Sequence, residues 1–300
     1  MKSADDAGPQ ATAAEPPRPI RIGPRLFEWG SRTYVMGIVN VTPDSFSGDG
    51  LLAAVAGRRG DQAEAAVVQA RRMVEEGADI IDVGGESTRP GHDPVARDEE
   101  AARVIPVIAA IHAALPQVPI SVDTAKPAVA DAAIAAGASL INDVWGVSTD
   151  DAMARLAAAR GVPMVVMHNR AESHYRDFAA ELMDDLRDAL DRAVAAGVPR
   201  ENLIVDPGFG FGKTPEHNLA VMRELAGLRR LGRPILLGTS RKSTIGRVLG
   251  GLPVEDRLEG TLATTALGIA AGIDIVRVHD VRANVRAALV ADAICRGASK

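Results

Sequence analysis

The sequence predicts an α/β protein with a (β/α)8 TIM barrel fold, and three observations lead to this prediction. Eight short apolar segments alternate with segments of helical periodicity. Four junctions between a helical segment and the next apolar run look alike: EEGADIIDV, AAGASLIND, ARGVPMVVM and AAGIDIVRV. The alternation extends over about 270 residues, which is the usual size of a (β/α)8 barrel.

The eight predicted strands are mostly continuous apolar runs. A strand with one side in water alternates apolar and polar residues, so continuous runs indicate strands that are buried on both faces. Parallel strands covered by helices have this character. The runs cover residues 34–41, 79–84, 119–123, 140–144, 163–167, 203–206, 234–238 and 274–278.

The predicted helices lie between these strands. Apolar residues recur at i, i+3, i+4 and i+7 in residues 63–74, and every fourth residue is apolar from residue 178 to residue 194. A helix often ends at a residue with left-handed backbone, which glycine adopts without strain. The four glycines predicted to turn the chain from helix to strand are Gly77, Gly137, Gly161 and Gly272.

A doubly wound open sheet is the alternative arrangement of alternating strands and helices. That fold binds dinucleotides through a G-x-G-x-x-G motif after its first strand. The residues after the first predicted strand read NVTPDSFSGDG and contain no such motif. The barrel is therefore the favoured fold.

The composition excludes several classes of protein. The 300 residues are 24% charged and 47% hydrophobic, as in soluble globular proteins. The 34 Lys and Arg against 39 Asp and Glu give a net charge of −5, which argues against a main role in nucleic-acid binding. The single cysteine, Cys295, can form neither an internal disulfide nor a cysteine-rich zinc cluster, which fits a reducing compartment.

The chain is predicted to divide into a tail and one domain. Residues 1–19 consist mainly of Ala, Pro, Gly and acidic residues, so we expect a disordered tail, followed by a barrel domain at residues 20–300. The tail lacks the apolar core of a signal peptide, and no later stretch stays apolar for the roughly 18 residues that a membrane-spanning helix needs. A cytoplasmic protein is therefore expected.

Polar residues occur where the predicted strands end. In a (β/α)8 barrel the carboxyl ends of all strands meet at one mouth, where active sites lie. A single Asp after a strand is more often the cap of the next helix than a ligand. Asp123 and Asp206, however, directly end their apolar runs, and Asn142 lies within one. We therefore expect these three side chains to converge on the barrel mouth.

Two carboxylates and an amide without a cluster of His or Cys form a poor zinc site. They suit a flat heterocycle with N–H donors, because a carboxylate accepts two such bonds and Asn both donates and accepts. Lys242 and Met167 can cover the remaining edges and faces of such a ring.

Cationic and hydroxyl residues follow the seventh and eighth strands, the usual phosphate location in these barrels. They are Ser240, Arg241, Arg277 and His279. Asn40, after the first strand, offers an oxygen ligand of the kind that Mg²⁺ accepts when phosphate supplies the other ligands. A heterocycle below an anionic leaving group suggests group transfer with loss of phosphate or pyrophosphate.

Two further motifs suggest other chemistry. The stretch PGFGFGKT at residues 207–214 ends like a phosphate-binding P-loop, but Pro207 occupies the position of the required first glycine. We expect its glycines to let the loop and Phe211 approach a ligand closely. His168 and His174 are spaced like a metal pair, yet without further ligands a polar loop explains both.

Eight stretches of the sequence resemble the dihydropteroate synthase family. They span residues 36–281 and read MGIVNVTPDSFS, DIIDVGGESTRPG, ISVDT, GASLINDVWG, VVMH, IVDPGFGFGKTPEHN, PILLGTSRKSTIG and IVRVHDV. The resemblance implies a transferase that joins 6-hydroxymethyl-7,8-dihydropterin diphosphate to 4-aminobenzoate in folate biosynthesis, with release of pyrophosphate. It also implies Mg²⁺ as cofactor and a homodimer.

The resemblance assigns roles to residues at matching positions. Four would hold the pterin: Asp123, Asn142, Asp206 and Lys242. Two would line its pocket: Met167 and Gly238. Asn40 would bind Mg²⁺, and three residues would contact the diphosphate: Thr88, Arg277 and His279.

The aminobenzoate site would be bordered by Phe211 and Ser240. Two loops would complete it, with the residues Asp44, Ser45, Ser47, Ser87 and Arg89.

The implied chemistry is electrostatic. Asp206 would accept N–H bonds from the pterin and so favour electron release from the ring as the C–O bond to diphosphate breaks. Mg²⁺, Arg277 and His279 would stabilise the departing charge. The expected catalytic residues are Asp206, Lys242 and Arg277.

Two alternatives stay open. A pterin-binding methyltransferase domain would share the barrel and the pterin contacts but lack the aminobenzoate loops. The stretches TPDSFS, STRP and SRK favour the synthase over this alternative. A homologue that binds pterin without catalysis is the other. For the homodimer, the apolar residues of the last two helices offer a face, or pack against the barrel; they are Leu262, Leu267, Ile269 and Leu289.

Overall fold

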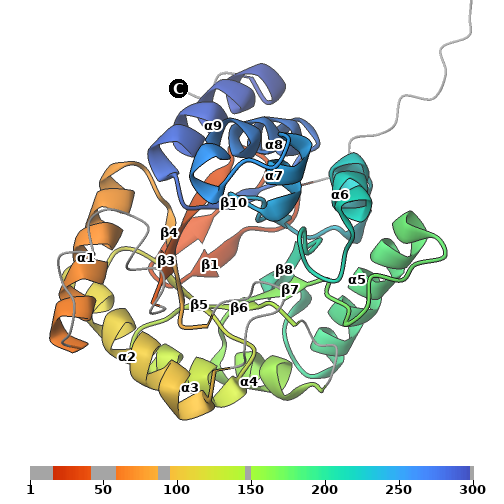
Figure 1. Ribbon diagram of the computed structural model, residues 1–300. Helices are drawn as coiled ribbons and strands as arrows, with labels where there is room; N and C mark the ends of the chain where they lie inside the picture. Colours follow the sequence, from red (N-terminus) through yellow and green to blue (C-terminus); the bar gives the residue numbers. More distant parts are fainter. Residues whose placement is uncertain (1–15, 42–58, 87–94, 146–149, 298–300) are drawn as a thin grey trace, which may run out of the picture.

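Eight parallel strands form a barrel with helices around it, which confirms the predicted fold (Figure 1). The computed structural model describes residues 16–41, 59–86, 95–145 and 150–297. The strands follow the order β8-β7-β6-β5-β4-β3-β10-β9. Their bounds are β3 Tyr34–Asn40, β4 Ile80–Gly84, β5 Ile120–Asp123, β6 Leu140–Asp143, β7 Met164–Met167, β8 Leu203–Asp206, β9 Leu236–Leu237 and β10 Ile275–Val278.

The two outer strands of this order close the barrel. A parallel bridge joins Val205 of β8 to Ile235, which directly precedes β9. In addition, the amide of Val205 donates a hydrogen bond to the carbonyl of Pro234 over 2.9 Å. The sheet therefore continues from β9 back to β8.

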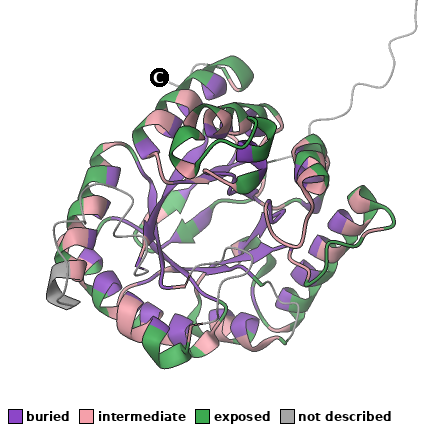
Figure 2. Ribbon diagram, in the orientation of Figure 1, coloured by how far each residue is buried: buried purple, intermediate pink, exposed green. Residues whose placement is uncertain are grey.

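The helices form an outer ring whose inner sides are buried against the strands (Figure 2). Alanines and branched aliphatic residues dominate the contact layer, as expected for a chain that is only 3% aromatic. The bounds are α1 Arg59–Glu75, α2 Arg97–Ala114, α3 Pro127–Ala135, α4 Ala152–Arg160, α5 Phe178–Ala195, α6 Pro215–Leu228, α7 Ser243–Val248, α8 Leu258–Ala270 and α9 Val281–Cys295.

All four glycines that the sequence predicts at helix ends have positive φ. Gly137 shows why no other residue fits: its φ is +119°, and a Cβ there would lie 2.4 Å from Cγ of His112. The glycine therefore serves both the left-handed turn and the close contact between α2 and the start of β6.

A short hairpin that the sequence analysis did not predict packs against the lower interior of the barrel. It consists of β1, Ile20–Ile22, and β2, Arg25–Phe27, paired antiparallel. Its residues Ile20, Ile22 and Phe27 are almost fully buried, whereas Leu26 is half exposed. The three buried residues form one cluster with inward side chains of the strands, namely Met36, Ile80, Leu140, Val165, Ile204, Leu236 and Ile275. The amino-terminal end of the barrel is thus filled by apolar side chains.

This apolar layer positions the site. Side chains along a strand alternate in direction, so residues two places beyond the layer also face the barrel interior. Among them are Asp82, Asn142, Met167, Asp206, Gly238 and Arg277. The polar residues therefore form the next layer towards the carboxyl end. The predicted tail stays a prediction, since residues 1–15 lie outside the described residues.

Candidate active site

Strand register places the predicted heterocycle-binding residues side by side. Asp123 of β5 pairs with Asn142 of β6, and Met167 of β7 pairs with Asp206 of β8. All four are buried. The structure therefore brings together residues that are distant in sequence, at one level of the barrel interior.

Arg277 of β10 crosses the interior and binds two carboxylates. Its Nε donates to Oδ2 of Asp82 over 2.6 Å, and its Nη2 donates to Oδ2 of Asp123 over 2.5 Å. Although burial lowers it, the Asp82 and Asp123 carboxylates raise the pKa of Arg277 above its ordinary value. Arg277 is therefore a permanent cation at the centre of the site.

Asp123 retains acceptor capacity. Its Oδ1 is buried without a hydrogen-bond partner among the described residues, as are Oδ1 of Asp82 and Oγ of Ser121. A buried acceptor without a partner is costly, so these atoms suit a ligand or water that donates hydrogen bonds. Burial raises the pKa of Asp123 to about 7; Arg277 lowers it and Asp82 raises it further.

Asp206 and Lys242 form the opposite side of this layer. Oδ1 of Asp206 accepts a hydrogen bond from the amide of Gly208 over 2.7 Å. Nζ of Lys242 donates to the carbonyl of Phe209 and lies 4.5 Å from the centre of the Phe211 ring. Burial raises the pKa of Asp206, whereas Lys242 lowers it. Burial lowers the pKa of Lys242 to about 8, against the raising effect of Asp206.

Gly238, at the end of β9, leaves space between these groups. A Cβ at this position would lie 3.9 Å from Oδ2 of Asp206 and 3.9 Å from Cβ of Arg277. A side chain larger than one methyl group would therefore occupy the volume between Asp206 and Arg277. The glycine keeps that part of the interior open.

At the rim, three predicted residues are in contact. Oγ of Ser240 lies 2.9 Å from Nδ1 of His279, and the amide of His279 donates to Oγ of Ser240 over 3.1 Å. Nε2 of His279 lies 3.5 Å from Nδ2 of Asn40. These contacts connect the ends of β3, β9 and β10 above the interior layer that contains Asp123 and Asp206.

Arg241 has a different role from the rim cation that the sequence suggested. Its guanidinium group forms a bidentate ion pair with Asp280, with distances of 2.9 and 2.7 Å. Its φ of +56° is in the left-handed region, which is rare for a residue with a side chain. Thr261 accepts a hydrogen bond from its amide. Arg241 therefore shapes the turn between Ser240 and Lys242.

Comparison with known proteins identifies the family. The pterin binding enzyme family matches residues 36–279. A dihydropteroate synthase of Clostridium beijerinckii is 50% identical over 278 residues, which are 92% of this chain and 100% of that protein. The chain belongs to the dihydropteroate synthase family, whose members are transferases.

Solved structures agree with this membership. Dihydropteroate synthase of Clostridium difficile, determined in the presence of pteroic acid, is 48% identical with a TM-score of 0.83; the match covers 90% of this chain and 99% of that one. Dihydropteroate synthase of Xanthomonas albilineans with 4-aminobenzoic acid is 42% identical with a TM-score of 0.85, and the match covers 93% and 98% of the two chains.

Some predicted residues cannot be placed. Asp44, Ser45, Ser47, Ser87, Thr88 and Arg89 lie outside the described residues. Within the described part of the chain there is no group of three or more His, Cys, Asp or Glu that could hold a metal ion. No described helix is long and apolar enough to cross a membrane.

Two residues of the site were not among those predicted to bind substrate. Asp82 lies on β4 within DIIDV, and its ion pair with Arg277 joins positions that are 195 residues apart. Lys213 follows Phe211 by two residues and binds backbone carbonyl groups beside the site. The signal for Asp82 was its place near the end of a strand; the signal for Lys213 was the motif resembling a P-loop.

The raised pKa of Asp123 predicts a pH dependence of stability. A carboxyl group that binds its proton more tightly in the folded state stabilises the fold below its unfolded pKa of 3.8, and this stabilisation is lost as the pH rises through about 7. Relative to Asp123→Asn, the wild type should lose free energy of unfolding across this window. Urea unfolding at a series of pH values measures this free energy. If it depends on pH in the same way in the wild type and in Asp123→Asn, the raised pKa of Asp123 is contradicted.

Proposed function

We propose that the chain joins 6-hydroxymethyl-7,8-dihydropterin diphosphate to 4-aminobenzoate, forming 7,8-dihydropteroate and pyrophosphate in folate biosynthesis. The observation that carries this proposal is the stacking of two layers in one barrel mouth. Buried carboxylate and amide groups suit the heterocycle, and the contacting Ser240, His279 and Asn40 lie above them. The family membership and the 4-aminobenzoic acid and pteroic acid of the related structures support it.

In this proposal the pterin binds between the Asp123 and Asp206 sides of the interior. The unpartnered Oδ1 of Asp123 accepts a hydrogen bond from the ring, and Asn142 beside it both accepts and donates. Met167 and Gly238 line the pocket, and the ring edge fits beside Gly238 because glycine has no side chain. Lys242, held near Asp206 by their attraction, donates to a ring acceptor.

The reaction places a positive charge on the pterin as the bond to diphosphate breaks. Asp206 is buried next to this charge, and in its ionised form it stabilises the ring as it releases electrons. Arg277 forms ion pairs with Asp82 and Asp123 below the ring and, together with His279 and Thr88, draws the leaving diphosphate. The neutral amine of 4-aminobenzoate, bordered by Phe211, Ser240 and the loops of Asp44–Ser47 and Ser87–Arg89, then attacks the exocyclic methylene carbon that the diphosphate leaves. The new C–N bond forms as the amine loses one proton.

The test of this function measures pyrophosphate release from the pterin diphosphate with and without 4-aminobenzoate. We expect release only when the amine is present. Asp206→Asn should reduce the rate by a factor of about 100 or more, because the amide carries no negative charge, while circular dichroism shows an intact fold. Release that is independent of the amine, or no release, would sink the synthase proposal. Wild-type activity of Asp206→Asn would refute the role of Asp206.

We also propose that Mg²⁺ binds at Asn40. The contact with His279 uses the amide nitrogen of Asn40, so its amide oxygen is the atom that can serve as a ligand. One neutral protein oxygen fits a hard cation whose other ligands are diphosphate oxygens and water. Bound there, Mg²⁺ would neutralise charge on the leaving group.

The magnesium proposal predicts that pyrophosphate release stops after chelation and returns when Mg²⁺ is added. Asn40→Ala should raise the Mg²⁺ concentration for half-maximal rate by about tenfold, the loss expected for one charge-assisted contact. Asn202→Ala, at the opposite end of the barrel, is the control and should leave this concentration unchanged. The same magnesium dependence in Asn40→Ala and the wild type would exclude Asn40 as a ligand.

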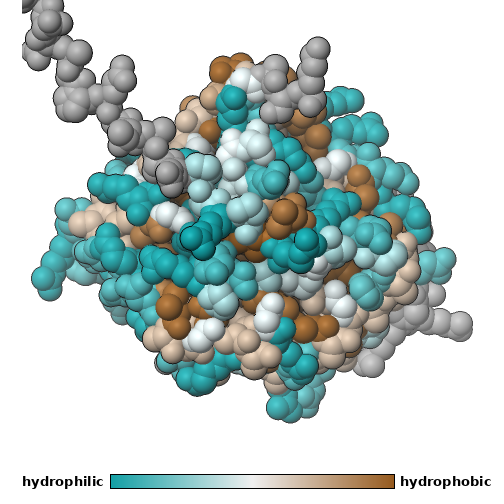
Figure 3. Space-filling view, turned by 180° about the vertical axis from the view of Figure 1, so that it is seen from behind, coloured by the Kyte–Doolittle hydropathy of each residue, from teal (hydrophilic) through white to brown (hydrophobic). Residues whose placement is uncertain are grey.

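A homodimer through α8 and α9 is a further proposal. Leu267, Leu289 and Ile294 are 64%, 66% and 78% exposed, whereas Ile269 is buried against the barrel. Viewed from behind, some of the exposed hydrophobic residues lie near the top of the molecule, where Figure 1 places these helices (Figure 3). Exposed apolar residues in such number indicate a contact surface.

The cytoplasmic location also stays a proposal, supported by the lone Cys295.

The dimer proposal predicts a concentration-dependent mass of two chains in analytical ultracentrifugation. Leu289→Glu together with Ile294→Glu should shift the mass to one chain, because each buries a charge in the interface. Val68→Glu is the matched control, since Val68 on α1 is 53% exposed outside this face. A monomeric wild type, or equal dissociation by Val68→Glu, would contradict the proposed face.

A further inference from the structure

The loop between β8 and α6 packs directly against the backbone that follows β7. Gly208 has φ +68°, and a Cβ there would lie 1.8 Å from the carbonyl oxygen of His168. Gly212 has φ +53°, and a Cβ there would lie 2.3 Å from the carbonyl oxygen of Arg170. Only glycine allows this approach, so the motif that resembles a P-loop serves contact between two backbone segments.

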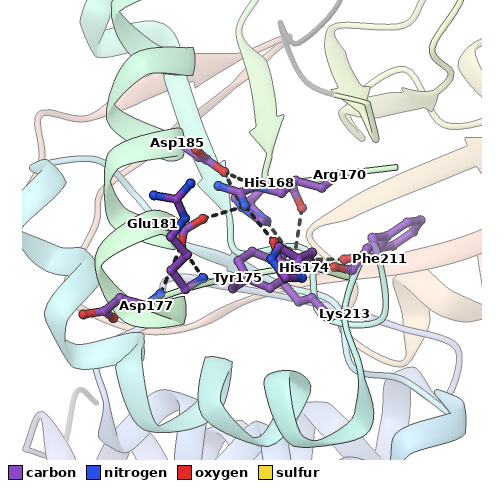
Figure 4. Close-up of polar contacts among 11 residues, drawn as sticks. His168, Arg170, His174, Tyr175, Asp177, Glu181, Asp185, Phe211 and Lys213 are labelled. Atoms are coloured by element: carbon purple, nitrogen blue, oxygen red, sulfur yellow. Dashed lines mark hydrogen bonds and ion pairs between the residues drawn. The ribbon is translucent and has the colours of Figure 1, made fainter. Parts of the chain in front are cut away.

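Lys213 joins these two segments. Its Nζ lies 2.8 Å from Nδ1 of His168, 3.3 Å from the carbonyl oxygen of His168 and 3.0 Å from the carbonyl oxygen of Phe211 (Figure 4). An ammonium group has three hydrogen-bond donors, and three acceptors surround this one. The lysine therefore binds the backbone of Phe211 and the end of β7 at once.

Burial and the neighbouring groups determine which nitrogen of His168 carries a proton. Its Nε2 lies 2.9 Å from Oδ2 of Asp185, which also accepts a hydrogen bond from Arg170 over 2.7 Å. Burial lowers the pKa of His168, which favours the neutral ring. A neutral ring that donates from Nε2 to Asp185 has its lone pair at Nδ1, where Lys213 donates. The chain of contacts thus runs from Arg170 on one side to Phe211 on the other.

Phe211 is held from two sides by lysines. Lys213 binds its carbonyl group, and Nζ of Lys242 lies 4.5 Å from the centre of its ring. Lys213 keeps this place although burial lowers its pKa to about 7, with Asp206 raising the value and Lys242 lowering it. Burial of the Lys213 ammonium group costs free energy of desolvation, which a lysine on a solvated loop does not incur.

We propose that Lys213 is a positioning residue, which fixes the backbone of Phe211 against the end of β7 and thereby sets the place of the Phe211 ring beside 4-aminobenzoate. This inference rests on the proposed function, because the ring borders the aminobenzoate part of the site only there. Lys213 itself binds protein carbonyl groups and the imidazole of His168. It acts on the substrate through Phe211.

Equilibrium binding separates this role from general stabilisation of the fold. Titration calorimetry of Lys213→Met should show pteroic acid binding weakened by about tenfold, because the aminobenzoate portion loses its aligned neighbour. Binding of 6-hydroxymethylpterin, which lacks that portion, should change by less than about twofold. Lys213→Gln retains donors for carbonyl groups and should give an intermediate loss. The KM for 4-aminobenzoate should rise in the same order.

Arg32→Met is the matched control, because it also replaces a hydrogen-bonded cation with methionine. Arg32 binds Asp79 over 2.6 Å at the amino-terminal end of the barrel. It should lower the Tm and leave both affinities unchanged. If Lys213→Met lowers the Tm but leaves the ratio of the two affinities as in the wild type, the positioning role is wrong. If Lys213→Met does not fold, the same ratio in Lys213→Gln decides the question.

The two proposals fail in different ways. Absence of amine-dependent pyrophosphate release by the wild type would refute the function, whatever the variants bind. An unchanged ratio of the affinities for pteroic acid and 6-hydroxymethylpterin in both Lys213 variants would refute the positioning role, even in an active synthase. Equal weakening of the two ligands is one form of this unchanged ratio, and it would place the effect of Lys213 on the pterin.

Discussion

The ion pairs of Arg277 with Asp82 and Asp123 decide what the barrel interior can hold. Without a cation between them, two carboxylates on neighbouring strands would repel each other in a medium that screens poorly. The guanidinium group has the planar array of donors that reaches both, at 2.6 and 2.5 Å. Asp123 can therefore present its second oxygen to the interior while the first is bound.

The polar layer as a whole is balanced in charge. Three acids and three bases lie in this layer or beside it: Asp82, Asp123, Asp206, Arg277, Lys242 and, in the loop after β8, Lys213. The pKa values of two of the bases, Lys242 and Lys213, are lowered by burial to about 8 and about 7. The layer is thus nearly neutral, yet it contains charged groups at fixed positions, as electrostatic catalysis requires.

The apolar layer beneath is what makes these charges effective. The hairpin of β1 and β2 and the inward side chains of seven strands fill the barrel below the carboxylates. Because this layer excludes water from one side, the interactions above it act in a lower effective dielectric than at the surface. Three of the nine aromatic residues lie here, because Phe27, Trp29 and Tyr34 are in mutual ring contact.

Much of the fold could be predicted because its signals are local. A buried parallel strand is a continuous apolar run, and β8 begins and ends at the predicted residues. The glycines at helix ends could be predicted for the same reason, since each reflects one backbone conformation. The hairpin could not, because strands of three residues are too short to show a period of two.

The site could be predicted only in part, since strand ends converge by topology but ion pairs do not follow from it. Asp123, Asn142 and Asp206 meet because all parallel strands end at one mouth. The partner of Arg277 depends instead on side-chain reach across the barrel. The sequence grouped Arg277 with the rim residues, whereas the structure places its guanidinium group on Asp82 and Asp123. The position of Arg277 along its strand does not specify how deep in the barrel its guanidinium group lies.

The residues 207–214 show how one composition can serve two different purposes. In a P-loop, glycines expose backbone N–H groups to phosphate, and the lysine adds a positive charge to the same ligand. Here Gly208 and Gly212 let one backbone lie against another, and the lysine between these segments binds carbonyl groups. The two lysines differ in where their ammonium groups point. A P-loop lysine points to the phosphate, whereas Lys213 donates to carbonyl groups of the protein and so holds the loop that carries Phe211. Composition defines the flexibility of such a loop, and the acceptors around the lysine define its use.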